Sequence, residues 1–316
     1  MIMTFNELKI TDPILKAIGE KGYLAPTPIQ QKGIPVALDG RDMLGIAQTG
    51  TGKTAAFAIP ILQHLSSGMQ AEPTDVPRRN RRGRNHGREY GVRPIRALIL
   101  TPTRELAVQI GDSFSDYGKY VGLKHLTIFG GVKQGPQVEA LRGGVDILIA
   151  TPGRLHDLIG QGFVELDAIT HFVLDEADRM LDMGFYDDIM QVYKLLPETC
   201  QTIMFSATMP PKIRTLAQTI LKNPEEVKIA ISRPPETIMQ TAYVCYDMQK
   251  LRILEDLFSQ SRPQRVIIFS SSKMKVKELA STLKRMKFNV AAMHSDLEQS
   301  QREEVMKEFK NGRIDI

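Results

Sequence analysis

Residues 47–54 read Ala-Gln-Thr-Gly-Thr-Gly-Lys-Thr, and they separate an apolar run, Asp42–Ala47, from a helical pattern, Lys53–Leu65. A strand, a glycine-rich loop and a helix in this order are typical of a phosphate-binding loop, because backbone N–H groups and the helix N-terminus face phosphate oxygens. Lys53 then reaches the β- and γ-phosphates, and the Thr54 hydroxyl can ligate Mg²⁺. A chance Gly-Lys-Thr in a loop is the alternative. The context favours nucleotide binding by Gln48, Thr49, Gly50, Thr51, Gly52, Lys53 and Thr54.

Short apolar runs alternate with longer helical stretches from Asp42 onward, as expected for βα units on a parallel sheet. We expect strands at Asp42–Ala47, Ile95–Leu100, Leu123–Phe129, Val145–Ala150, His171–Leu174, Thr202–Phe205 and Val227–Ile229. The helices between them include Lys53–Leu65, Arg104–Tyr120, Gly153–Ile159 and Pro211–Leu221. The pattern predicts a doubly wound α/β domain that binds its ligand at the carboxyl ends of the strands.

A second segment with residues suited to catalysis is Val173-Leu-Asp-Glu-Ala-Asp178, an apolar strand that ends in carboxylates. Asp175 at the strand end can hold Mg²⁺ through water, and Glu176 beside it can polarise an attacking water. Acidic residues alone are equally typical of a solvated helix start. Together with the lysine and threonine of the loop, they predict a site for nucleotide hydrolysis.

Two interruptions divide the chain. Residues 68–94 combine Gly, Pro, Asn and Arg without apolar periodicity, which predicts a surface insertion. The prolines of Ser232-Arg-Pro-Pro-Glu predict a linker over residues 232–240, because proline continues neither a helix nor a central strand. We therefore expect one domain over residues 1–231 and another over residues 241–316.

The second domain repeats the alternation of strands and helices. We expect strands at Thr241–Tyr246, Arg265–Phe269 and Val290–Met293, and helices at Leu251–Ser259, Val276–Met286 and Gln299–Phe309. Residues Gly312–Ile316 have the pattern of an unpaired half-strand, whereas domains usually run to ~100–150 residues. We expect this domain to be only partly present, with a natural terminus as the alternative.

Composition bounds the class of protein. Hydrophobic residues make up 42% and charged residues 24% of the 316 residues, as in ordinary soluble domains. Cys200 and Cys245 each lie apart from any Cys/His cluster, so neither a disulfide framework nor a zinc site is predicted. The N-terminus lacks the features of a signal peptide, and no apolar run approaches the ~20 residues of a membrane span. These features predict a reducing, cytoplasmic location.

The formal net charge of +5 is concentrated in one segment. Residues 78–93 hold seven arginines and one acid, Glu89, so this segment carries +6 and the rest of the chain −1. The basic balance therefore does not indicate that the folded surface is basic. The segment could act as a flexible tether that concentrates nucleic acid, or it could be a solvated loop without a function.

Asp175-Glu-Ala-Asp178 is the signature of the DEAD-box RNA helicases, which the chain resembles in motif order from Phe5 to Arg302. The segment 22–30, Gly-Tyr-Leu-Ala-Pro-Thr-Pro-Ile-Gln, with Phe5 seventeen residues upstream, is similar to the family's Q motif. The resemblance implies that Gln30 reads the adenine edge, that the aromatic packs on the base, and that ATP is preferred to GTP. It adds Phe5, Tyr23, Thr27 and Gln30 to the nucleotide contacts.

Segments that resemble the family's RNA-contacting motifs follow three expected strands and recur in the second domain. In the first domain they are Pro102-Thr-Arg-Glu-Leu-Ala107, Gly130-Gly131 and Thr151-Pro-Gly-Arg154; in the second they are Val266-Ile-Ile-Phe-Ser270 and Gln299-Ser-Gln-Arg302. Hydroxyl, guanidinium and glycine N–H groups suit phosphate oxygens, although each segment alone could be an ordinary cap, turn or buried strand. The resemblance implies RNA contacts by Pro102, Thr103, Arg104, Gly130, Gly131, Thr151, Gly153, Arg154, Gln299 and Arg302.

Ser206-Ala-Thr208 resembles the motif that couples hydrolysis to RNA handling, through a hydrogen bond toward Asp178. A helix N-cap explains the same residues. The resemblance as a whole implies two RecA-like domains, ATP and Mg²⁺ as cofactors, and RNA gripped through its backbone while short duplexes are separated. The family's arginines that reach the γ-phosphate would follow Ile316, so we expect this chain to bind ATP without full activity. An RNA clamp that never separates strands and a DNA helicase are the alternatives.

Overall fold

The structure is a computed structural model that describes residues 3–67, 93–229, 238–260 and 264–316. The chain forms two compact units, Met1–Arg233 and Pro234–Ile316, and the division falls inside the expected linker. The expected insertion at 68–94 lies outside the described residues except at its last two positions. None of the described helices is long and apolar enough to cross a membrane.

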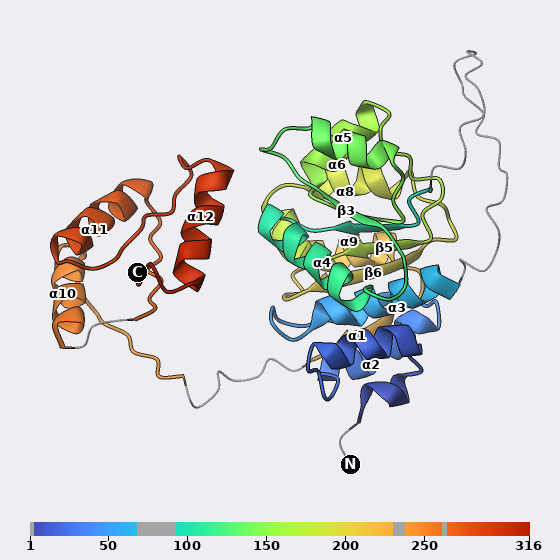
Figure 1. Ribbon diagram of the computed structural model, residues 1–316, viewed down its shortest axis with the longest axis horizontal. Helices are drawn as coiled ribbons and strands as arrows, with labels where there is room; N and C mark the ends of the chain where they lie inside the picture. The colour runs from blue at the N-terminus through green and yellow to red at the C-terminus, as the bar shows by residue number, and fades with distance from the viewer. Residues whose placement is uncertain (1–2, 68–92, 230–237, 261–263) are drawn as a thin grey trace. The chain divides into compact units, whose positions relative to one another are not determined.

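The first unit is built on a parallel sheet of seven strands in the order β3-β4-β2-β5-β6-β1-β7 (Figure 1). The strands are β1 Met43–Ile46, β2 Ala97–Leu100, β3 His125–Ile128, β4 Ile147–Ala150, β5 His171–Leu174, β6 Gln201–Ser206 and β7 Glu225–Lys228. The predicted α/β class and the seven predicted strands are confirmed, with small differences at the ends. The order places β1, β5 and β2, which carry the predicted motifs, inside the sheet.

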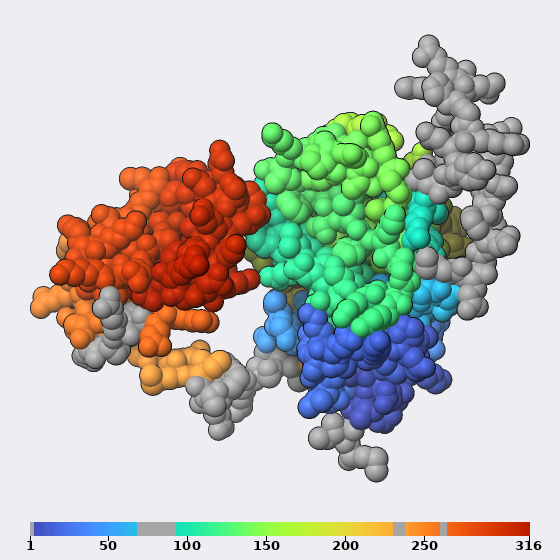
Figure 2. Space-filling view, in the orientation of Figure 1, coloured from blue at the N-terminus to red at the C-terminus, as the bar shows by residue number. Residues whose placement is uncertain are grey.

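Helices cover both faces of this sheet, because side chains alternate between its faces along each strand. Ile99, Ile149 and Val173 join one hydrophobic cluster, whereas Leu100 and Leu174 join the other. The first cluster is covered by the 3-10 helix η1 Phe5–Leu8 and by α1 Asp12–Glu20, α2 Pro28–Leu38, α3 Lys53–Ser67 and α4 Arg104–Tyr117. The second is covered by α5 Gly135–Arg142, α6 Pro152–Gly160, α7 Ala177–Asp182, α8 Tyr186–Tyr193 and α9 Pro211–Ile220. In the space-filling view the amino-terminal residues, in blue, form one continuous side of this unit (Figure 2).

The second unit contains the three predicted helices, as α10 Lys250–Gln260, α11 Lys273–Arg285 and α12 Gln299–Lys310, with the 3-10 helix η3 Asp247–Gln249 before them. The three strands predicted for this unit were wrong: Thr241–Tyr246, Arg265–Phe269 and Val290–Met293 are not strands in the described residues. Isolated backbone hydrogen bonds join these segments instead of the continuous ladder of a β-sheet. Asp315 accepts from the N–H of Val266 (2.8 Å) and donates to Asn289 (2.9 Å).

The end of the chain is therefore paired on two sides, and the expectation of an unpaired half-strand was wrong. The N–H of Ala291 donates to the Ile316 carbonyl over 3.1 Å, and the Ile316 side chain is buried. Thr241–Tyr246 includes exposed side chains such as Val244 and Tyr246, which explains why its β propensity alone produced no strand.

Arg93 has a structural role that the sequence did not reveal. Its guanidinium donates to Asp146 Oδ2 (2.8 Å), while Arg96 donates to Asp146 Oδ1 (2.7 Å) and the Lys124 N–H also donates to Oδ2 (2.9 Å). Burial raises the pKa of Asp146, but these hydrogen bonds outweigh that effect and hold its pKa below the ordinary value. Arg93 therefore anchors the end of the arginine-rich segment and is not part of a free basic tether; the other six arginines lie outside the described residues.

Candidate active site

The glycine-rich loop joins the end of β1 to the start of α3, as the sequence predicted. Gly50 and Gly52 adopt φ values of 84° and 91°, a left-handed conformation that glycine adopts without steric cost. A Cβ atom on Gly52 would lie 2.4 Å from the Gln30 side-chain nitrogen, so a larger residue here would displace this amide.

Lys53 is held beside a carboxylate in a position where it has unused hydrogen-bonding capacity. Its side chain is 6% exposed, and its Nζ lies 3.7 Å from Asp175 Oδ1 without a hydrogen-bond partner among the described residues. A buried ammonium normally has its donors satisfied, because leaving them unpaired is costly. The Lys53 ammonium therefore fits a site that receives phosphate oxygens.

Asp175 and Glu176 follow β5 and face the same loop. Burial raises the pKa of Asp175, against the lowering effect of the Lys53 ammonium, and Asp175 Oδ1 accepts a hydrogen bond from the Glu176 N–H (3.0 Å). Glu176 has a φ of 55°, a left-handed conformation that costs a non-glycine residue ~1–2 kcal/mol. Its carboxylate accepts a hydrogen bond from the Thr49 hydroxyl (3.1 Å) and lies 3.4 Å from Arg179. The strained backbone thus holds this carboxylate against the phosphate-binding loop.

The donors near the loop fit Mg²⁺ that is bound mainly by a nucleotide. Among the described residues, no three His, Cys, Asp or Glu side chains gather into a metal site. Mg²⁺ keeps several waters and commonly takes one or two carboxylates together with substrate phosphates. Asp175 and the Thr54 hydroxyl, at the first turn of α3, are donors of this kind.

Gln30 links the amino-terminal part of the unit to the loop. Its Oε1 accepts from the Thr27 N–H (2.9 Å), and its Nε2 donates to the Gly52 carbonyl (3.1 Å). Both ends of the amide are therefore occupied by backbone groups. Of the two aromatic residues predicted to contact the nucleotide, Phe5 is only 6% exposed in the first hydrophobic cluster, whereas Tyr23 is half exposed and packs against Tyr117.

Two arginines predicted to contact RNA converge on one loop. The Arg104 guanidinium lies against Gly131, where a Cβ atom would be 2.2 Å from Nη2 and where φ is 78°. Arg154 donates from Nη2 to the Val132 carbonyl (3.2 Å), and no described residue offers its buried Nη1 a hydrogen bond. Because the loop and the arginines follow the neighbouring strands β3, β2 and β4, the sheet order brings them together.

The other residues predicted to contact RNA in the first unit lie at strand ends, helix N-caps and first helical turns. Thr103 is the N-cap of α4, where its hydroxyl accepts from the Leu106 N–H (3.4 Å). Thr151 stands at the N-cap of α6 without a side-chain capping bond. Pro102, Gly130 and Gly153 lie at the same strand ends or first turns. Gln299 and Arg302 belong to α12 in the second unit.

The predicted hydrogen bond between Asp178 and the Ser206–Thr208 segment is present. Thr208 donates to Asp178 Oδ2 from its backbone N–H (2.9 Å) and from its hydroxyl (2.8 Å). The Ser206 hydroxyl donates to the Thr208 carbonyl (2.7 Å), which fixes the turn after β6. The start of α7 is thereby tied to the end of β6.

Comparison with known proteins agrees with this arrangement. The model of the DEAD/DEAH box helicase family matches residues 27–216, which include the glycine-rich loop and both acidic residues, and the model of the helicase conserved C-terminal domain matches residues 249–316. The chain belongs to the DEAD/DEAH box helicase family.

Relatives of this DEAD-box chain are similar along almost its whole length. It is 38% identical over 315 residues to the DEAD-box ATP-dependent RNA helicase CshA of Streptococcus pneumoniae serotype 4, covering 99% of the chain and 56% of the relative. It is 38% identical over 316 residues to the ATP-dependent RNA helicase DeaD of Escherichia coli strain K12, covering 99% and 46%. The chain thus spans about half the length of these curated relatives.

A solved structure extends the likeness to the fold. The crystal structure of a DEAD box protein from the hyperthermophile Methanococcus jannaschii matches with a TM-score of 0.61 and 35% identity, covering 99% of this chain and 79% of that one. The RecA-like fold expected from the sequence is thereby supported for this DEAD-box chain.

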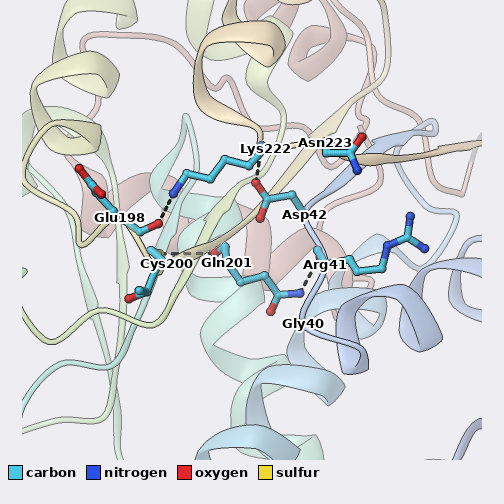
Figure 3. Close-up of a pocket in the computed structure, with 9 residues that line it drawn as sticks. Gly40, Arg41, Asp42, Glu198, Cys200, Gln201, Lys222 and Asn223 are labelled. Atoms are coloured by element: carbon cyan, nitrogen blue, oxygen red, sulfur yellow. Dashed lines mark hydrogen bonds between the residues drawn. The ribbon is translucent and has the colours of Figure 1, made fainter.

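A cavity of about 300 Å³ in this DEAD-box chain lies away from these residues (Figure 3). It is lined by residues that precede β1, β6 and β7, so it lies at the amino ends of the strands, opposite the glycine-rich loop. Its Asp42 carboxylate is satisfied by the N–H groups of Thr202 (2.8 Å) and Lys222 (2.7 Å), and Lys222 donates to the Glu198 carbonyl. These contacts fasten the amino ends of the strands, and we assign the cavity no ligand.

Sequence reasoning missed the contacts that bind the motifs of this DEAD-box chain to one another. It placed Thr49 among the nucleotide contacts but gave no sign that its hydroxyl bonds to Glu176. It gave none for the bond from Gln30 to Gly52 either. These pairs are separated by 127 and 22 residues, so no local pattern could have indicated them.

Proposed function

We propose that this chain is the ATP-binding part of an ATP-dependent RNA helicase that grips RNA through its backbone and separates short duplexes. The observation that carries the proposal is the buried ammonium of Lys53 at the end of the glycine-rich loop. It lies beside Asp175 and has no hydrogen-bond partner in the part of the chain that the structure describes. A phosphate chain supplies the oxygens that this ammonium lacks.

The roles of the residues follow from their positions. The loop N–H groups and the α3 N-terminus bind the phosphates, and Lys53 stabilises charge that develops on the transferred group. Bound Mg²⁺ would neutralise the phosphate oxygens, held by Asp175 and Thr54. Glu176 orients the attacking water and accepts its proton, while the Thr49 hydroxyl holds the carboxylate against the loop.

RNA binding is proposed for the edge of the sheet at Arg104, Arg154 and the loop 130–132. Guanidinium groups recognise phosphate through paired hydrogen bonds but carry no information about base identity. Recognition should therefore be largely independent of RNA sequence. RNA-backbone contacts are proposed for Gln299 and Arg302 on α12 of the second unit as well.

We expect slow ATP turnover by these 316 residues. In the described part of the first unit, Lys53 faces the loop, whereas the nearby Arg179 forms an ion pair with Glu176. An additional arginine at the transferred phosphoryl group is worth ~10³–10⁵ in rate in related reactions. Measurement of ATP hydrolysis with and without single-stranded RNA tests this, and strong stimulation by RNA would contradict it.

The substitution Lys53→Ala tests the phosphate site directly. We expect it to reduce ATP turnover by ~10² or more, because it removes a cation that acts on the transition state. Binding of a fluorescent ATP analogue should weaken in parallel, while circular dichroism should show a folded protein. Lys194→Ala, at an exposed lysine after α8, is the control. Unchanged affinity and turnover in Lys53→Ala would refute the phosphate site.

A further inference from the structure

Thr101, the residue after β2, has a buried hydroxyl for which the described structure offers no hydrogen-bond partner. Its side chain is 0% exposed, and its Oγ1 atom is unpaired. Hydroxyl groups that are buried normally have a partner, because an unmade hydrogen bond is costly. The unpaired hydroxyl therefore indicates that a partner becomes available in another state of the site.

The sheet register places Thr101 beside Asp175. Leu100 of β2 pairs with Leu174 of β5, and each is followed directly by one of the two residues. The pairing continues past the strand ends, since the Asp175 N–H donates to the Leu100 carbonyl (2.9 Å) and the Thr101 N–H donates to Ala150 (3.1 Å). Paired residues on strands ~4.8 Å apart project from the same face. Thr101 and Asp175 therefore lie side by side on the face that carries α3.

Asp175 has few other polar neighbours along the sheet. The register of β5 with β6 pairs Leu174 with Met204, which gives Asp175 the apolar Phe205 as its second neighbour. Its remaining partners are the Glu176 N–H and the Lys53 ammonium. When phosphate oxygens draw Lys53 away, the carboxylate loses the positive charge beside it, and the Thr101 hydroxyl is the uncharged donor next to it.

We propose that Thr101 is a positioning residue for Asp175. In the nucleotide-bound state its hydroxyl donates a hydrogen bond to the carboxylate, which fixes the oxygen that faces Mg²⁺. This inference rests on the proposed function, because it assumes that a nucleotide with Mg²⁺ occupies the loop. Groups that orient a metal-binding carboxylate in this way commonly affect metal affinity by ~10–100-fold when they are removed.

The test compares Thr101→Val, which removes the hydroxyl at almost constant shape, with Thr101→Ser, which keeps it. Binding of a fluorescent ATP analogue is titrated with Mg²⁺ and repeated in EDTA. We expect Thr101→Val to raise the half-saturating Mg²⁺ concentration about tenfold and to leave binding in EDTA unchanged. Thr101→Ser should restore most of the response. Thr202→Val, a buried threonine at the amino end of β6, is the matched control and should change neither measurement.

Each other outcome overturns the inference. An unchanged Mg²⁺ response in Thr101→Val, while the unsubstituted chain binds Mg²⁺ and nucleotide, would refute the role of Thr101 and leave the proposed function intact. Equal losses with and without Mg²⁺, or equal defects in the serine and valine variants, would assign Thr101 a packing role. Failure of the unsubstituted chain to bind the nucleotide would overturn both the inference and the proposed function.

Discussion

At the scale of single residues, Gln30 illustrates how one amide can join the backbone to a ligand. Its amide is bonded at both ends, to Thr27 and to Gly52. Each of these two atoms keeps one further hydrogen-bonding position, the second lone pair of Oε1 and the second N–H of Nε2. The proposed contact to the adenine edge can therefore form beside the bonds to Thr27 and Gly52, and Gln30 would then link the base to the glycine-rich loop.

We predict that Gln30→Ala reduces discrimination between ATP and GTP more than it weakens phosphate binding, because the methyl group offers no hydrogen bond to either base. Competition of each nucleotide against a fluorescent ATP analogue measures both quantities. Gln31→Ala is the matched control, since Gln31 is the neighbouring amide and donates to the Pro26 carbonyl (2.8 Å) instead of to the loop. Equal proportional losses for ATP and GTP would remove the adenine-reading role.

Arg154 permits a second prediction at this scale, because its buried Nη1 finds no hydrogen-bond partner within residues 3–67, 93–229, 238–260 and 264–316. We expect Arg154→Ala to weaken binding of single-stranded RNA of any sequence. The slope of the logarithm of the binding constant against the logarithm of the salt concentration should become smaller by about one. Fluorescence anisotropy at several salt concentrations gives the slope. Arg142→Ala removes the same charge from an arginine that lies over Phe163. Identical slopes in the two variants would argue against a phosphate contact at Arg154.

At the scale of elements, a pair of histidines joins α2, α3 and β5. His64 of α3 bonds the Leu38 carbonyl (3.0 Å) and His171 of β5 (2.9 Å). A carbonyl only accepts, so Nε2 of His64 is the donor and its Nδ1 accepts from His171 when both rings are neutral. Burial, reinforced by His64 and Arg96, lowers the pKa of His171 to about 4. The bond between the rings therefore persists in the neutral state.

This pKa predicts how stability depends on pH. Unfolded His171 has a pKa near 6.5, so between pH 6.5 and 4 the unfolded state binds a proton that the folded state does not. The free energy of unfolding is therefore highest above pH 6.5. It falls by about 3 kcal/mol in total as the pH falls to 4. Urea unfolding at several pH values measures this dependence. The free energy of unfolding should change less with pH in His171→Gln than in the unsubstituted chain. His156→Gln, at an exposed histidine, should keep the original slope; equal slopes in all three proteins would contradict the prediction.

At the scale of the whole molecule, the arginine-rich segment allows a prediction about how its positive charge affects association with RNA. Because Arg93 is bonded to Asp146, only the six arginines of residues 78–92 are candidates for a tether. We predict that deletion of residues 78–92 weakens association with RNA and flattens its salt dependence, with little change in the free energy of unfolding. Arg93→Ala is expected to lower that free energy instead, since Asp146 loses a partner. An unchanged salt slope after the deletion would favour a solvated loop without a function.

The sequence by itself determined the parts of this protein that depend on neighbours in the chain. The apolar run before the glycines specifies β1, and the glycines, Lys53 and the start of α3 specify the loop, because each follows from local periodicity and backbone freedom. The same local patterns predicted the seven strands of the first unit. They failed for Arg265–Phe269 and Val290–Met293, because a strand exists only when successive residues pair with a partner.

Only the tertiary structure decided which side chains meet. The register of β2 with β5 brings Thr101 to Asp175, although 74 residues separate them in the sequence. The sheet order brings Arg104 and Arg154 to the loop at Gly131, and folding brings Arg93 to Asp146. Propensity and motif spacing describe one segment at a time, whereas hydrogen bonds and ion pairs between distant segments depend on how the whole chain packs.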